Sequence, residues 1–377
     1  MRLLYPQARR SSRLFEILEK LVKTLDRERV GRVYLIILGG VYPSGYRAFG
    51  RRRYDLGKFD AESKKYVNMK HIFADAFNFL MHDGKQVIQP DQLFPVDTTE
   101  IAVPYGNGAR TPVQKYRDSL KIWAAMRDQN IIYVLLGGEI QAKIHYAAAV
   151  KDMVYDALNY AGQVDQASMS YRAKKNEGDI VYGDNSVTIK LTSEEFLSGF
   201  RKEDKLIPVV TAVIYFGEKP WDGPLSLYEM FGLPEEELEA LKPFVPNYTV
   251  NLIPPKDVDE KDFDLKFSTG LGLAFNAIKH SQGNAVDILM NSNHRKIDRA
   301  SAVFIKEVLN FDLEFSEPEE EGEVDMCKAV EDYTLKTKVL ALIDYLTGEG
   351  NTKEEIIKKI VSKYSVTPEY VEGLMAA

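Results

Sequence analysis

Two strongly apolar runs, residues 130–136 and 206–216, lie on either side of a long segment with helical periodicity. Runs of this length and composition are typical of strands buried on both faces of a sheet. The segment between them has helical spacing from about His145 through Val164, with an inward face predicted at Val150, Met153, Val154, Ala157 and Leu158. A strand, a helix and a second strand in this order predict an α/β sheet with a crossover helix.

Upstream of this unit, one helix is well marked and one segment is ambiguous. The helix is predicted by apolar residues at helical spacing and by a turn signal after them: Ile72, Phe73, Ala76, Phe77, Leu80 and Asp83-Gly84. The segment 114–123 fits a strand and a helix equally well.

Composition divides the chain into four stretches. Residues 1–68 form a basic N-terminal extension, in which a helical stripe around residues 14–25 and a strand at 33–38 are expected; Met69 is an alternative start. Residues 69–310 carry the alternating elements, and 311–325 form an acidic linker. Residues 326–377 form a helical segment, with a capping-box pattern at Thr352–Glu355 and a proline after a good N-cap at Thr367-Pro368.

Charge, cysteine content and hydropathy exclude several classes of protein. The formal net charge is −7, with 45% hydrophobic and 28% charged residues, which is ordinary for a globular chain. The single cysteine excludes a disulfide framework and a cysteine-based zinc site. No apolar run approaches the roughly 18 residues of a membrane span, and the start lacks the apolar core of a signal peptide. We therefore expect no membrane partner and a cytoplasmic location.

The first buried strand leads directly into polar side chains. Glu139 and Gln141 end the run Leu135-Leu136-Gly137-Gly138-Glu139-Ile140-Gln141, and alternation along a strand points both to one face. If the segment containing Asp118 is the neighbouring strand, two carboxylates converge at the strand ends. Hard oxygen ligands suit Mg²⁺ or Mn²⁺, and such a cation can act on a phosphodiester. The spacing alone is weak, but a glutamate ending an apolar strand is costly unless a cation, donor or ligand meets it.

Several separate motifs occur in an order that resembles a known family. They are Phe73-Ala74-Asp75-Ala76-Phe77-Asn78, Val96-Asp97-Thr98-Thr99-Glu100, Gln114-Lys115-Tyr116-Arg117-Asp118, Gly138-Glu139-Ile140-Gln141, Tyr155-Asp156-Ala157-Leu158 and Trp221-Asp222-Gly223-Pro224. Together they resemble the Rpn recombination-promoting nucleases, also called YhgA-like putative transposases, over residues 66–310. That family belongs to the PD-(D/E)XK nuclease superfamily.

The resemblance implies a restriction-endonuclease-like core, a mixed sheet flanked by helices, that acts as a Mg²⁺-dependent DNA endonuclease linked to recombination or mobile elements. It implies Asp118 and Glu139 as metal ligands, and Gln141 in place of the more usual lysine. Asp75 corresponds to the acidic residue on the first core helix, and Lys151 to a basic residue that faces the phosphate. Ala142 departs from the serine that often follows the glutamine.

Basic residues after the predicted helix are candidates for contacts to DNA phosphates. They are Lys174, Lys175, Arg201 and Lys202. A solvated surface is the alternative interpretation of such residues.

Two further hypotheses do not involve catalysis. The pair 356–364 and 368–374 has helix-turn-helix spacing, which fits a DNA-binding regulator or a transposon-associated adaptor, but its second helix contains Glu369 and Glu372 and no lysine or arginine. The other hypothesis is a nuclease fold that has lost activity. Many enzymes of the superfamily pair to cut both strands, so a homo-oligomer is left open.

Overall fold

Packing divides the chain into two units, Met1–Arg53 and Tyr54–Ala377, and the fold described here is that of the second. The computed structural model describes residues 56–102, 113–127, 130–175, 181–182, 185–186, 191–217, 219–281, 283–293, 295–315 and 322–376. The helical stripe and the strand predicted within residues 1–55 lie outside these ranges. Helix α3 (Leu56–Val67), at the end of the predicted N-terminal extension, buries Tyr66 and Val67 in the main core.

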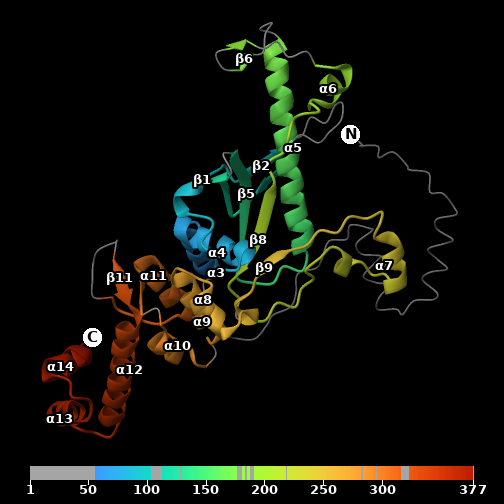
Figure 1. Ribbon diagram of the computed structural model, residues 1–377. Coiled ribbons are helices and arrows are strands. Elements are labelled where there is room, and N and C mark those ends of the chain that lie inside the picture. Colours follow the sequence, from blue (N-terminus) through green and yellow to red (C-terminus); the bar gives the residue numbers. More distant parts are fainter. Residues whose placement is uncertain are drawn as a thin grey trace, which may run out of the picture. The chain divides into compact units, whose positions relative to one another are not determined.

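A five-stranded mixed sheet lies at the centre of this unit (Figure 1). Its strand order is β1 (Leu93–Pro95), β4 (Ser119–Arg127), β5 (Asn130–Gln141), β8 (Val209–Tyr215) and β9 (Asn251–Ile253). Strands β1, β4 and β5 pair antiparallel, whereas β5, β8 and β9 pair parallel. Helix α5 (Ala148–Lys175) connects β5 to β8, so the predicted α/β sheet with its crossover helix is confirmed.

The ambiguous segment 114–123 forms strands. Strand β3 (Val113–Tyr116) pairs with β2 (Thr99–Ala102), and β4 follows after a break at Arg117 and Asp118. Strand β4 pairs with β5 from Ser119↔Gly138 to Arg127↔Asn130. Asp118 therefore immediately precedes the first residue of β4, at the end of the sheet where Glu139 lies.

One face of the sheet carries the main hydrophobic core. Helices α3, α4 (Lys70–His82), α9 (Gly270–Lys279) and α11 (Arg299–Leu309) cover it. Its largest buried side chains include Phe73, Phe77, Leu136, Ile214, Leu271 and Phe275. Helix α4 ends at His82 and is followed by Asp83 and Gly84, which both have positive φ, so the predicted helix and its closing turn are confirmed.

Helix α5 covers the other face of the sheet (Figure 1). Ala148 and Ala149 pack there against Val213 of β8 and Val250. The buried face of the helix also includes Asp152, Tyr155 and Asp156. This differs from the predicted inward face, because Ala157 is exposed and two carboxylates occupy positions that the hydrophobic pattern leaves out.

Shorter elements complete the unit. They are η1 (Pro90–Gln92), β6 (Val181–Tyr182), β7 (Asn185–Ser186), α6 (Ser193–Ser198), η2 (Tyr228–Met230), α7 (Glu235–Leu241), η3 (Pro255–Asp257), α8 (Glu260–Leu265), α10 (Ala285–Asn291), β10 (Lys296–Asp298) and β11 (Glu323–Asp325). Strand β11 pairs with β10, so the second half of the predicted acidic linker is partly structured. Residues 316–321 of that linker lie outside the described ranges.

The C-terminal segment is helical, as predicted. It consists of α12 (Met326–Gly348), α13 (Lys353–Tyr364) and α14 (Pro368–Ala376). The start of α12 buries Met326 and Val330 in the main core, whereas its second half forms a separate small core with α13 and α14. The predicted capping box is present: Thr352 accepts a hydrogen bond from the Glu355 amide and donates its own amide to the Glu355 side chain.

Within the described part of the chain, no helix is both long enough and apolar enough to cross a membrane.

Candidate active site

Asp118 and Glu139 meet at the end of the β4–β5 hairpin. The Ile140 amide donates a hydrogen bond of 3.0 Å to Asp118 Oδ2, which ties this carboxylate to the strand that carries Glu139. The other oxygen, Asp118 Oδ1, lies 3.0 Å from Lys64 Nζ of α3. The antiparallel pairing of β4 with β5 thus brings together the two carboxylates that the sequence predicted as a pair.

Glu139 is a buried carboxylate with one partner. Its side chain is 1% exposed, and its Oε2 lies 2.5 Å from Lys151 Nζ in the first turns of α5. Its Oε1 is buried and has no hydrogen-bond partner among the described residues. Burial raises the pKa of the Glu139 carboxyl above its ordinary value, and the Lys151 ammonium opposes this effect without cancelling it.

Gln141 follows Glu139 on the same face of β5 and is also buried. Both its amide oxygen and its amide nitrogen lack a hydrogen-bond partner in the described part of the structure. A buried amide without partners costs about 1–3 kcal/mol. Gln141 and Glu139 therefore present unsatisfied polar atoms next to each other, which is the pattern expected where a ligand or ordered water completes the site.

Asp152 is a third carboxylate here, and our sequence reasoning missed it. Its side chain is buried, and neither carboxylate oxygen has a hydrogen-bond partner among the described residues. Burial, followed by the negative charge of Glu139, raises the pKa of Asp152 to about 7. The available signal was its spacing of four residues from Ala148 and Asp156 on α5, which places all three on one helix face.

A hydrogen-bonded network adjoins these groups. Asp156 of α5 accepts hydrogen bonds from Arg117 Nη2 at 2.7 Å, Thr211 Oγ1 at 2.6 Å and the Tyr248 hydroxyl at 2.6 Å. Arg117 also donates to Thr211 at 2.5 Å. A Cβ added at Gly137 would meet Arg117 Nη1 and lie 3.1 Å from Thr211 Oγ1, so glycine leaves the space that this network fills. The network fixes α5 against β8 and the start of β4.

Asp75 lies elsewhere. Its carboxylate accepts hydrogen bonds from the backbone and hydroxyl groups of Ser268 and Thr269, at 2.6–3.1 Å, where α9 begins. Gln86 Nε2 adds a longer hydrogen bond of 3.4 Å. Helix α4 packs on the face of the sheet toward which Gly138 points, because a Cβ at Gly138 would contact Phe73. Asp75 is therefore across the sheet from Glu139, where it holds the residues just before α9; the N-cap of that helix is Thr269.

The basic residues predicted to contact DNA phosphates lie near the far end of α5, away from Asp118 and Glu139. Tyr171, in the last turns of α5, donates to Asp204 at 2.7 and 2.8 Å and so holds the segment that contains Arg201 and Lys202. From Lys151 to Tyr171 the helix rises about 30 Å. Arg201 pairs with Glu203 at 3.1 Å. The side chains of Lys174 and Lys175 lie outside the described part of the structure.

Comparisons with protein-family models, curated proteins and solved structures give no match. The resemblance to the Rpn family therefore stays a prediction, and the geometry of the site is what supports a function. Within the described ranges, no group of three or more His, Cys, Asp or Glu side chains could hold a metal ion. The candidate metal ligands are accordingly the carboxylate pair Asp118 and Glu139, with the Gln141 amide and the Asp152 carboxyl beside them.

Proposed function

We propose that this chain is a metal-dependent DNA endonuclease of the PD-(D/E)XK type, in which Asp118 and Glu139 are the metal ligands. One observation carries the proposal. Asp118 and Glu139 meet at the end of a β-hairpin, and Glu139 Oε1 is buried without a hydrogen-bond partner among the described residues. A buried, unpaired carboxylate oxygen is costly unless a cation or donor binds it.

The donor atoms fit Mg²⁺ or Mn²⁺. Mg²⁺ is usually held by only one or two carboxylates, with water and substrate phosphate in the remaining positions. Asp118 and Glu139 meet that requirement without a third acid, and the Gln141 amide oxygen adds a neutral ligand of the same hard type. When bound, such a cation stabilises negative charge on a phosphate and lowers the pKa of a water molecule.

The protein's own groups have separate roles in this proposal. Lys151 holds Glu139 ionised and oriented, since burial alone favours the protonated carboxyl. The Ile140 amide fixes the orientation of Asp118. Gln141 can position a water molecule by hydrogen bonding, although it lacks the positive charge of a lysine. The choice of DNA as substrate, and the link to recombination or mobile elements, come from the resemblance.

The test is cleavage of supercoiled plasmid with Mg²⁺ or Mn²⁺ by the full chain and by the variants Asp118→Ala and Glu139→Ala. Each is expected to lower the rate about 100-fold or more, because the metal's contribution is several kcal/mol. Glu237→Ala, which changes an exposed carboxylate on α7, is the matched control and is expected to cleave like the wild type. Circular dichroism checks that the variants are folded. Unchanged cleavage by both site variants would overturn the metal-ligand assignment.

The pairing of the carboxylates with lysines favours a second candidate. Lys64 binds Asp118 and Lys151 binds Glu139, so each carboxylate is already neutralised by an amine. A non-catalytic DNA-binding protein with this fold has the same pairs. It binds the plasmid but leaves it uncut with either cation. The C-terminal helices fit DNA binding poorly in either case, because acidic residues repel phosphates: Glu369 is exposed on α14, and Glu372 on the same helix pairs with Lys353.

A further inference from the structure

A pocket opens beyond the ends of strands β5 and β8, next to the candidate active site. It has a volume of about 490 Å³, within the range of small-molecule sites. Tyr215, the last residue of β8, and the segments that follow the two parallel strands form part of its wall, through Ala142, Lys143, Ile144, Tyr146, Phe216, Gly217, Lys219 and Asp222. Helices α3, α9 and α11 contribute Phe59, Ile278 and Val308. Pockets at the carboxyl ends of parallel strands are common ligand sites in α/β proteins.

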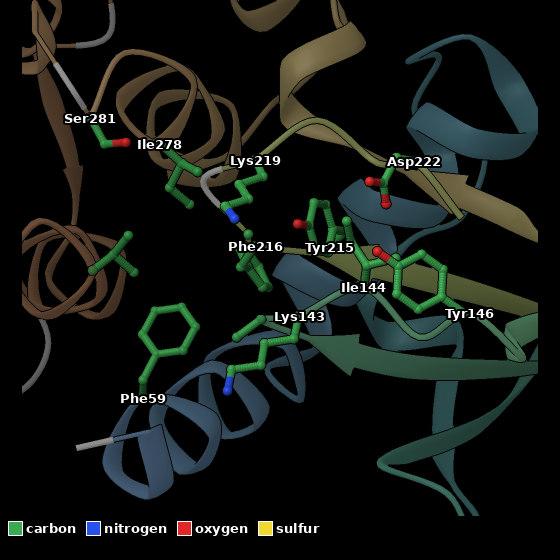
Figure 2. A pocket seen from close by; sticks show the side chains of 13 residues that line it. Phe59, Lys143, Ile144, Tyr146, Tyr215, Phe216, Lys219, Asp222, Ile278 and Ser281 are labelled. Atoms are coloured by element: carbon green, nitrogen blue, oxygen red, sulfur yellow. The ribbon is translucent and has the colours of Figure 1, made fainter. Parts of the chain in front are cut away.

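The lining combines aromatic rings with amines. Phe59, Phe216 and Tyr215 contribute rings, and Lys143 and Lys219 are exposed cations at the same pocket (Figure 2). In the described part of the chain, neither lysine pairs with a carboxylate. The Ser281 hydroxyl oxygen is buried in the pocket wall and has no hydrogen-bond partner among the described residues. Asp222, the acidic residue of the lining, interacts with the Tyr146 hydroxyl and raises the pKa of that group.

We propose that this pocket binds one nucleotide of the DNA strand, with the base against the ring of Phe59 and the phosphate at Lys143 and Lys219. This inference rests on the proposed function and names a subsite for its substrate. Bases stack on aromatic side chains whatever their sequence, and amines pair with phosphate. A purely apolar ligand would leave both amines unused.

The position of the pocket agrees with a strand held at the candidate active site. Ala142, which lines the pocket, directly follows β5 and is three residues beyond Glu139, about 10 Å along an extended chain. This is about three times the 3.4 Å rise per nucleotide of a DNA strand. On α3, Phe59 lines the pocket while Lys64 binds Asp118. The same two elements therefore reach both the pocket and the carboxylate pair.

The test is isothermal titration of the full chain, without divalent cation, with dAMP and with deoxyribose 5-phosphate, which lacks the base. The wild type is expected to bind dAMP about tenfold more tightly, the value of one base–aromatic stack. Phe59→Leu is expected to abolish this preference, and Phe59→Tyr, which keeps a ring, to retain it. Lys219→Glu is expected to weaken both ligands about tenfold through loss of a charge contact to phosphate. A single-stranded 12-mer is expected to displace dAMP.

The controls change an exposed ring and an exposed amine away from the pocket. Phe244→Leu and Lys261→Glu are expected to bind both ligands like the wild type. Equal dAMP affinity in the wild type, Phe59→Leu and Lys219→Glu would overturn the pocket assignment. Failure of the 12-mer to displace dAMP would show that the pocket takes a free nucleotide, which overturns its role as a substrate subsite.

The outcomes also separate this inference from the proposed function. If plasmid is cut in an Asp118- and Glu139-dependent way while dAMP does not bind, the nuclease assignment stands and the pocket assignment fails. If dAMP and the 12-mer bind with the expected dependence on Phe59 and Lys219 but no plasmid is cut, the pocket assignment stands and the nuclease assignment fails.

Discussion

Asp75 on one face of the central sheet and the pair Glu139 and Asp152 on the other are buried carboxylates with very different numbers of hydrogen-bond partners. On the face covered by α4 and α9, the Asp75 carboxylate accepts hydrogen bonds from both backbone and side-chain donors where α9 begins. On the face covered by α5, Glu139 Oε1 and both oxygens of Asp152 have no hydrogen-bond partner among the described residues. A buried carboxylate whose oxygens all accept hydrogen bonds fits a structural role. Buried oxygens without partners instead indicate a place for a ligand, water or cation. Three substitutions test this difference.

The largest effect is expected for Asp75→Ala. This change leaves the amides and hydroxyls of Ser268 and Thr269 buried without their acceptor. The free energy of unfolding should fall by about 3–5 kcal/mol, since each unsatisfied buried donor costs about 1–3 kcal/mol. Urea denaturation followed by circular dichroism measures it, and Asp75→Asn, which keeps one acceptor oxygen, should lose less. Wild-type stability together with impaired cleavage would instead make Asp75 the functional acid that the family resemblance implies.

A smaller effect, dependent on pH, is expected for Lys151→Met. Glu139 then has no ion-pair partner in a buried position, which costs about 3 kcal/mol at pH 8. The pKa of Glu139 is already raised by burial, and loss of the Lys151 charge raises it further, so the carboxyl takes up a proton as the pH falls. The deficit in unfolding free energy should therefore shrink by pH 5. Added Mg²⁺ should raise the melting temperature of this variant more than that of Lys261→Met, because a cation replaces the lost amine. If Lys151→Met were as stable as the wild type at both pH values, the buried ion pair would be contradicted.

The smallest effect is a gain in stability for Asp152→Asn. The folded-state pKa of about 7 lies above the ordinary value of 3.8, so the wild type loses stability as the pH rises between these values. The charged groups around Asp152 are Glu139 on β5, Lys151 and Asp156 on α5, and Arg117 before β4. Asparagine cannot ionise but brings an amide to be satisfied, so the net gain at pH 8 should be about 1–2 kcal/mol.

At pH 4 the gain from Asp152→Asn should vanish, because the wild-type carboxyl is then protonated and resembles the amide in shape and charge. Parallel urea denaturation of the two proteins at pH 4 and pH 8 measures the difference. A gain of the same size at both pH values would show that ionisation of Asp152 is not its cause.

The sequence predicted the sheet better than it predicted the side chains around the site. The strand that carries Glu139, the crossover helix and the strand after it are marked by long apolar runs, and all three are confirmed. The segment with Asp118 remained ambiguous because β4 buries the polar residues Ser119 and Lys121, which obscure the period of a strand. Lys121 donates hydrogen bonds to Ser119 and to Asn68, and the contact with Asn68 is a long-range one that no local pattern reveals.

The buried face of α5 was assigned incorrectly for a related reason. Hydrophobic periodicity assumes that charged residues face solvent, but Asp156 is buried by its pairing with Arg117, Thr211 and Tyr248. Those partners come from three other segments of the chain. Lys64 is a similar case, since its contact with Asp118 joins residues on α3 and before β4. Side-chain partners of this kind become visible only when the tertiary structure is known.

Gly137 has a consequence for how this protein can change over evolutionary time. A side chain at this position would occupy the place of the Arg117 guanidinium, so a lone substitution forces the arginine out of its network. Shortening Arg117 alone would strand Asp156 without its cation. Either single substitution is therefore expected to disrupt the network, so the two positions should change together. In related sequences, loss of this glycine should coincide with loss of the arginine.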